Sequence, residues 1–105
     1  MRIKEDQVLE DIDLSQDPIL IQETFIKPEY TKEATAAAVQ GLFVIDVFVN
    51  ENGDVEEAEL TKTVGYEMDE LLLRAAKESK FTPRRDRTGI PLPSWATIEV
   101  RLILD

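Results

Sequence analysis

Hydrophobic positions alternate in the middle of the chain, and this alternation predicts a β-hairpin. The run 42–49 (LFVIDVFV) is rich in β-branched and aromatic residues, and a second run at 55–63 follows the turn dipeptide Asn52-Gly53. With a period of two, the odd-numbered residues of the first run share one face of the strand. The even-numbered residues share the other face, which Asp46 marks as the more solvated one.

Helical periodicity occurs twice, once on each side of this hairpin. Thr31 is followed by KEATAAAVQ and then by Gly41, so an N-cap hydroxyl, alanines at helical spacing and a C-terminal glycine predict a short helix. Residues 66–80 (YEMDELLLRAAKESK) place apolar side chains on one stripe, with acidic residues near the start and lysines near the end, as the helix dipole favours. Phe81 and Pro83 end this second helix.

The C-terminal run 95–104 alternates throughout and predicts a half-buried strand. Its even-numbered residues, from Ala96 to Leu104, are apolar, whereas Trp95 begins the opposite series of Trp, Thr, Glu, Arg and Ile. The preceding segment 84–93 (RRDRTGIPLP) is predicted to be a loop, because its prolines exclude a central strand.

The predicted order is helix, strand, strand, helix, strand, which makes an α+β fold. A right-handed crossover through the second helix places the last strand beside the first and antiparallel to it. The result is a three-stranded antiparallel or mixed sheet with both helices on one face. The first strand is then central, and the last strand is an edge whose unpaired backbone groups are available to another chain.

Residues 1–27 precede this pattern as a lead-in or linker end, and residues 28–105 form the predicted domain. Residues 19–26 are apolar and lie between two prolines, which is compatible with an additional N-terminal strand. Open edge strands are usually covered, and an apolar stretch is unfavourable in water. We therefore expect residues 19–26 to lie along the sheet or its edge, within one molecule or exchanged in a homodimer, and to compete with an incoming segment.

Composition excludes several classes of function. The chain of 105 residues contains neither cysteine nor histidine, which excludes disulfides, thiolate zinc sites and histidine-dependent nucleophiles. A net charge of -10 repels nucleic acid and anionic lipid. No run approaches the roughly 20 apolar residues that span a membrane. We expect a binding domain without metal or cofactor, and not an enzyme.

Two acidic stretches resemble chemical sites but have simpler explanations. NENGDVEEAE has the look of a calcium loop, yet alignment on Gly53 puts Phe48 where the first ligand must be an aspartate. A hairpin turn is therefore favoured. Carboxylate pairs such as Glu56 and Glu57 lie in stretches expected to be solvated, with no sign of a cleft.

The basic residues and the tryptophan leave two interpretations open. Lys80, Arg84, Arg85 and Arg87 form either a solvated loop or a docking patch for acidic groups. Trp95 projects from the strand face opposite the aliphatic series, where it either packs under a loop or anchors a partner.

A series of short motifs runs along the chain in a characteristic order. They are Pro28-Glu29-Tyr30 before the alanine-rich helix, Gly41 at the start of a strand, Asn52-Gly53-Asp54-Val55 in the turn, Gly65 and Met68-Asp69 at the second helix, Phe81-Thr82-Pro83 after it, and Gly89-Ile90-Pro91-Leu92-Pro93 before the last strand. Each motif alone is weak. In their order and spacing they resemble the TonB C-terminal domain family over about residues 28–104.

The resemblance implies a periplasmic domain that is carried on an inner-membrane anchor and driven by a proton-powered motor of the ExbB/ExbD type. Its partners would be TonB-dependent outer-membrane receptors for siderophores, cobalamin or similar cargo. In the family, a receptor segment called the TonB box pairs with the last strand, and residues before the tyrosine help to hold it. Carried onto this chain, the protein-binding positions are Ile26, Lys27, Pro28, Tyr30, Trp95, Thr97, Ile98, Glu99, Val100, Arg101 and Leu102.

The sequence departs from the family's pattern at three positions. Thr31 stands where a proline usually follows the tyrosine, Ser79 replaces an aromatic residue, and Lys27 stands where some members have glutamine. These departures concern the choice of receptor more than the fold.

The leading hypothesis is receptor binding by β-augmentation, in support of energy-dependent uptake. Its rival is an adaptor or scaffold domain of another periplasmic machine, for secretion or motility, that uses the same fold. Neighbouring genes for a motor and for receptors would favour the first hypothesis, and secretion or motility genes would favour the second.

Overall fold

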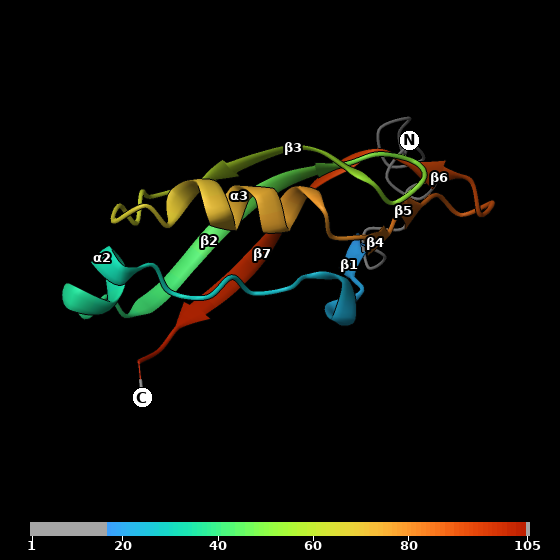
Figure 1. The fold of residues 1–105 in the computed structure, drawn as a ribbon. Coiled ribbons are helices and arrows are strands. Elements are labelled where there is room, and N and C mark those ends of the chain that lie inside the picture. Colours follow the sequence, from blue (N-terminus) through green and yellow to red (C-terminus); the bar gives the residue numbers. More distant parts are fainter. Residues whose placement is uncertain (1–16, 105) are drawn as a thin grey trace.

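The computed structural model describes residues 17–104 and has an α+β fold with a three-stranded antiparallel main sheet (Figure 1). In chain order the elements are β1 (Ile19–Leu20), the 3-10 helix η1 (Gln22–Thr24), α2 (Lys32–Ala36), β2 (Gly41–Val49), β3 (Val55–Leu60), α3 (Asp69–Lys77), β4 (Phe81–Thr82), β5 (Arg84–Arg85), β6 (Pro91–Leu92) and β7 (Ser94–Leu102). The main sheet has the order β3-β2-β7, and both outer strands run antiparallel to β2. The predicted central position of the first strand and edge position of the last strand are confirmed.

The hydrophobic core lies between α3 and one face of this sheet. Ile45 and Val47 of β2 are completely buried, as is Leu72 of α3. Ala34 of α2 belongs to the same core, so both helices pack on one face, as predicted. The core cluster consists of Ala34, Ile45, Val47, Val49, Val55, Met68, Leu72, Ala76, Phe81, Ile98, Val100 and Leu102.

The first helix is shorter than its sequence suggests. The hydroxyl of Thr31 accepts a hydrogen bond from the amide of Ala34 (3.0 Å), which confirms the predicted N-cap. The helix ends at Ala36 because Ala38 adopts a left-handed conformation (φ 55°). The prediction that Gly41 supplies this left-handed cap is wrong, since Gly41 is already the first residue of β2.

The second helix begins at Asp69, three residues later than the pattern predicts. Tyr66 and Glu67 have φ values of 55° and 65°, which a right-handed helix excludes. Asp69 organises this turn: its carboxylate accepts hydrogen bonds from the Thr63 hydroxyl and from the amide of Val64 (2.7 Å). Burial alone would raise the pKa of Asp69, but these bonds, with a further one from the Gly65 amide, outweigh it and lower the pKa.

The prediction that segment 84–93 is a plain loop is wrong, because the segment contains a small hairpin. Its strands β5 and β6 pair antiparallel, with Arg84 opposite Leu92. Asp86 closes the turn by accepting hydrogen bonds from the hydroxyl and amide of Thr88 and from the amide of Ile90. The hydrogen bond from the Thr88 hydroxyl is the main cause of the lowered pKa of Asp86. Because this ladder is separate from the main sheet, its prolines do not interrupt a central strand.

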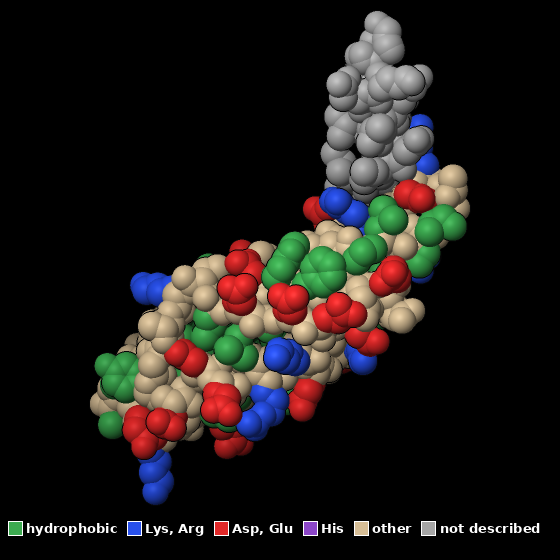
Figure 2. All heavy atoms as spheres, turned by 90° about the horizontal axis from the view of Figure 1, so that it is seen from above, with side chains coloured by type: hydrophobic (Ala, Val, Ile, Leu, Met, Phe, Trp, Pro, Cys, Tyr) green, Lys and Arg blue, Asp and Glu red, His purple; other side chains and the backbone are tan. Residues whose placement is uncertain are grey.

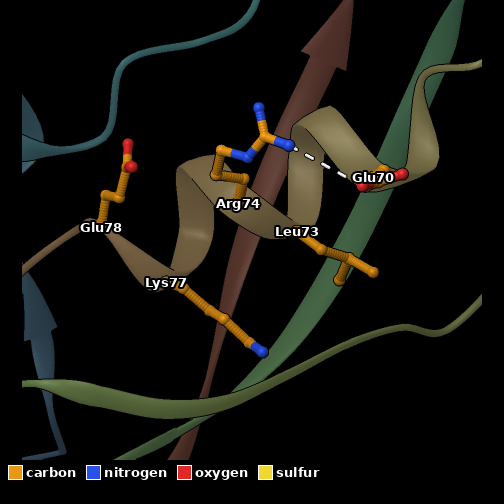
Figure 3. A pocket seen from close by; sticks show the side chains of 5 residues that line it. All are labelled: Glu70, Leu73, Arg74, Lys77 and Glu78. Atoms are coloured by element: carbon orange, nitrogen blue, oxygen red, sulfur yellow. Dashed lines mark ion pairs between the residues drawn. The ribbon is translucent and has the colours of Figure 1, made fainter.

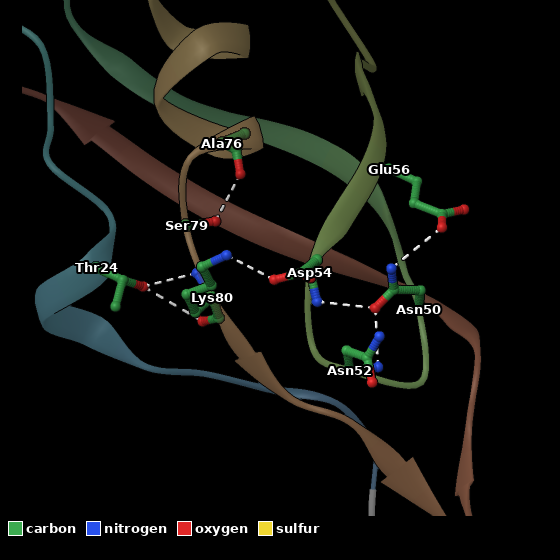
Figure 4. A network of polar contacts seen from close by, with 8 residues as sticks. All are labelled: Thr24, Asn50, Asn52, Asp54, Glu56, Ala76, Ser79 and Lys80. Atoms are coloured by element: carbon green, nitrogen blue, oxygen red, sulfur yellow. Dashed lines mark hydrogen bonds and ion pairs between the residues drawn. The ribbon is translucent and has the colours of Figure 1, made fainter.

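Three parts of the chain meet at Lys80, just after α3 (Figure 4). The amide of Lys80 donates to the hydroxyl of Thr24 (2.8 Å), and its carbonyl accepts from the amide of Ile21 (2.9 Å). Its ammonium lies 2.5 Å from the carboxylate of Asp54 in the β2–β3 turn. These contacts tie the N-terminal segment to β4, with which β1 pairs.

The N-terminal strand thus exists. Contrary to the expectation, it does not lie along the main sheet. It is two residues long, and its partner is β4. The extended backbone after α3 offers unpaired groups on both sides, and β1 fills one side while the bridge between Asp54 and Lys80 fills the other. The expectations concerning residues 1–16, which belong to the lead-in, fall outside the described residues.

Gly53 allows the hairpin turn to pack closely on β4. Its carbonyl accepts the amide of Phe81 (2.8 Å), its φ is 85°, and an added Cβ would lie 2.1 Å from the carbonyl oxygen of Phe81. We expect Gly53→Ala to lower the free energy of unfolding by about 2 kcal/mol in urea titrations, since the turn must leave β4. Gly89→Ala is the matched control, because Gly89 has φ 91° and open space around it, and should cost about 1 kcal/mol. Equal losses in both variants would contradict the close approach.

Candidate protein-interaction edge

The direction of hydrogen bonding alternates along a strand, so the pairing of β2 identifies the open backbone groups of β7. The amide of Thr61 donates to the carbonyl of Val44 (3.1 Å), which shows that even-numbered residues of β2 bond to β3. Odd-numbered residues such as Ile45, which lies opposite Ile98, therefore bond to β7. The even-numbered residues of β7 form their peptide hydrogen bonds with β2. The N–H and C=O groups on the other side, which we call the open edge, belong to Trp95, Thr97, Glu99 and Arg101.

This parity divides the binding positions that the sequence predicts in β7 into two groups. Ile98, Val100 and Leu102 are at most 2% exposed, because their side chains lie in the core and their peptide groups bond to β2. The residues of the open edge have exposed side chains on the opposite face of the sheet. Among residues 17–104, no strand pairs with the open edge. A partner strand therefore meets the backbone of the odd-numbered residues only.

The predicted positions before α2 lie in residues 25–30, which we call the strap. In Figure 1 the strap is the coil between η1 and α2, and it passes the C-terminal part of β7. Ile26 is 71% exposed, whereas the Tyr30 ring is partly buried against the core and its hydroxyl donates to the carbonyl of Val39 (2.5 Å). Pro28, between them, is half-buried. Tyr30 thus holds the strap on the domain, and Ile26 remains accessible.

Lys27 connects the predicted positions in the strap to those in β7. Its ammonium donates a hydrogen bond to the carbonyl of Arg101 at 2.6 Å, across 74 residues of sequence. This carbonyl is one of the open-edge groups. The strap therefore contacts the open edge at its C-terminal end and leaves the groups of Trp95, Thr97 and Glu99 free of hydrogen-bond partners among the backbone groups of the described chain.

Trp95 lies on the face of the sheet opposite the core and packs edge-on against Phe48, with ring centroids 5.4 Å apart and an interplanar angle of 64°. Its side chain is 50% exposed, so no loop of residues 17–104 buries it. The register places Glu57 on the other side of Phe48, and Asp46 between Glu59 and Thr97. Seen from above, the molecule has acidic side chains close to exposed hydrophobic ones (Figure 2). The open edge thus borders an acidic face with an aromatic pair.

Three of the four clustered basic residues make contacts within the described part of the chain. Lys80 pairs with Asp54, Arg84 pairs with Asp17, and the guanidinium of Arg85 donates to the carbonyl of Gly89 (2.9 Å). These contacts favour the interpretation as a loop for the three residues, and the docking of acidic groups stays a prediction that includes the exposed Arg87.

A shallow hollow on the outer side of α3 also lacks the features of a binding site. It is lined by Glu70, Leu73, Arg74, Lys77 and Glu78, whose side chains point in different directions (Figure 3). Arg74 and Glu70 form a long ion pair of 3.7 Å on the exposed helix surface. Within residues 17–104, no group of acidic residues is arranged to hold a metal ion.

Comparison with known protein families assigns this fold. The family model described as Gram-negative bacterial TonB protein C-terminal matches residues 26–104, from the strap to the end of β7 and two residues beyond. A comparison with curated protein sequences finds no match. No helix in the described part of the chain is long and apolar enough to cross a membrane. The chain belongs to the TonB C-terminal family, the periplasmic domain of Gram-negative proteins that transduce energy.

Proposed function

We propose that this domain binds a segment of an outer-membrane receptor as an additional strand along the open edge of β7. The observation that supports the proposal is the open edge itself. Within residues 17–104 its peptide groups have no hydrogen-bond partner, apart from the carbonyls of Trp95 and Arg101, which accept from the Ser94 hydroxyl and the Lys27 ammonium. An extended segment satisfies such groups with its own backbone, whatever its sequence.

Affinity and selectivity have different sources in this proposal. Each backbone hydrogen bond contributes only about 0.5–1.5 kcal/mol net, so several must form together to offset the ordering of a receptor segment. The side chains of Trp95, Thr97, Glu99 and Arg101 flank these bonds and choose among segments. Trp95, already supported by Phe48, provides an apolar surface that needs little further ordering.

The domain acts by binding, without catalysis or a cofactor. An inner-membrane anchor and a motor of the ExbB/ExbD type would pull on it, and the bound receptor would then admit a siderophore or similar cargo. The N-terminal segment that leads to such an anchor is fastened to β4 through Thr24 and Lys80, so a pull reaches the core directly.

Tryptophan fluorescence provides a direct test, because Trp95 is the only tryptophan and lies at the open edge. Blocked peptides from the extended N-terminal segments of TonB-dependent receptors of the same cell are titrated into the protein. We expect saturable changes in the emission of Trp95 and a one-to-one complex by calorimetry. Peptides of the same composition in scrambled order serve as the control. If no receptor segment binds, while a component of a secretion or motility machine does, the adaptor role replaces this proposal.

A further inference from the structure

We propose that Lys27 binds a carboxylate of the incoming segment, so that the open edge selects segments with an acidic residue beside Arg101. This inference rests on the proposed function, because it concerns the same edge. It adds the chemical class of side chain that the partner must carry and the place at which it must carry it.

The first argument is the position that Lys27 now occupies. Its ammonium donates to the carbonyl of Arg101 at 2.6 Å, and that carbonyl points to the open side of β7. Lysine is a common means of protecting an open strand edge. An added strand needs this carbonyl for one of its own N–H groups, so Lys27 must give way when the strand pairs along the full length of β7.

The second argument concerns the ammonium after it has been displaced. An ammonium has three donor hydrogens and no acceptor, and its strongest partner is a carboxylate. The strap is held in place by Tyr30, whose hydroxyl bonds to the carbonyl of Val39, so Lys27 stays beside the edge. A carboxylate on the incoming segment at this point is therefore within reach of the displaced ammonium.

The third argument is the local charge. The chain has a net charge of -10, yet Lys27 and Arg101 bring two cations to one end of the open edge. None of the ion pairs found within residues 17–104 includes either of them. Glu29 and Glu99, the acidic residues nearest to them in sequence, form no ion pair with them in this part of the chain.

The charges further along the edge restrict where an acidic residue is tolerated. Glu99 belongs to the open edge itself, and Asp46, opposite Thr97, lies on the same face of the sheet. A carboxylate next to these groups is repelled, whereas one beside Lys27 and Arg101 is attracted. The edge therefore selects an acidic residue at one end of the segment and neutral or basic residues in its middle.

The test uses blocked peptides with alternating serine and valine. Their length of about eight residues is within the usual range for a strand. Each carries a single glutamate, glutamine or lysine, in one series at the first position and in a second series at the last, because either strand direction is compatible with the open edge. Dissociation constants are measured at low salt by the fluorescence of Trp95. In one of the two series the glutamate peptide should bind about fivefold more tightly than the glutamine peptide, and the lysine peptide more weakly still.

Variants of Lys27 separate charge from hydrogen bonding. Lys27→Gln keeps a donor for the carbonyl of Arg101 but removes the charge, and should abolish the preference for glutamate. Lys27→Glu should reverse it in favour of lysine. Lys62→Gln is the matched control, since Lys62 is also exposed but lies in the turn after β3, and it should leave the preference unchanged. About 1 M salt should reduce the preference in the parent protein by screening.

Three outcomes would overturn the inference. They are equal binding of the three peptides in both series, a preference that persists in Lys27→Gln, and a preference lost equally in Lys62→Gln. If receptor segments bind at β7 but the glutamate preference is absent, only the role of Lys27 fails. If neither receptor segments nor these peptides bind at β7, the proposed function fails with it.

Discussion

Phe81→Ala is expected to lower the free energy of unfolding by about 3–5 kcal/mol, the largest loss of stability from any single truncation considered for this domain. Phe81 is only 3% exposed and belongs to the core cluster beneath α3. Its backbone is equally engaged, since its amide donates to Gly53 and β4 pairs with β1. The cavity left by the ring therefore opens where the helix, the hairpin turn and the N-terminal strand meet.

Urea unfolding followed by circular dichroism measures this loss, and Trp95→Ala is the comparison. Trp95 is half exposed, and its edge-on contact with Phe48 contributes about 0.5–1.5 kcal/mol beyond burial. A small domain is stable by about 5–15 kcal/mol, so Phe81→Ala should unfold at markedly lower urea concentration. A midpoint within experimental error of the parent, or a larger loss in Trp95→Ala, would show that the core is not centred on Phe81.

Thr97→Pro is expected to reduce the affinity for receptor segments by at least about tenfold while the domain remains folded. The amide of Thr97 points to the open edge, so a proline there removes a donor that β2 does not use. Its ring also projects toward the position of the incoming strand. Prolines are tolerated on edge strands for the same reason that they block pairing.

Two further variants make this result specific. Thr97→Val keeps the amide and the preference for a strand, and it should bind nearly as the parent does. Val100→Pro removes an amide that bonds to β2, opposite Phe43, and it should destabilise the fold instead. A folded Thr97→Pro variant that binds as tightly as Thr97→Val would mean that receptor segments do not pair with this edge.

The sequence predicts the main sheet well because its signals are local. The Asn52-Gly53 turn and the alternation on both sides of it define the hairpin, and the alternation after Trp95 defines β7. Strand order follows from the handedness of the crossover through α3. The helix boundaries are less well predicted, since residues other than glycine, Ala38 and Tyr66 among them, adopt left-handed conformations there.

The remaining features depend on contacts between distant parts of the chain. β1 pairs with β4, although its apolar sequence fits an exposed sheet edge equally well. The hairpin of β5 and β6 depends on the turn that Asp86 closes. The prolines in this segment favour the prediction of a loop instead. No local pattern marks these pairings, because strand partners are chosen by what the folded backbone leaves unpaired.

The family resemblance located the candidate site, and the structure shows which of its residues face the open edge. The predicted positions in β7 include both parities, and only the register separates the open residues, such as Thr97 and Glu99, from the buried Ile98. The contact between Lys27 and Arg101 has no local signal either, since it joins two segments that the fold brings together. Whether these positions bind a receptor remains a prediction of the proposed function.

Hydrogen exchange at single amides tests the central claim most directly. Ile98 and Val100 bond to β2, so their amides should exchange slowly with or without a receptor segment. The amides of Thr97 and Glu99 face the open edge and should exchange fast in the free protein and become strongly protected in the complex. Protection that appears on α3 instead, with the amides of Thr97 and Glu99 unchanged, would contradict strand addition at β7.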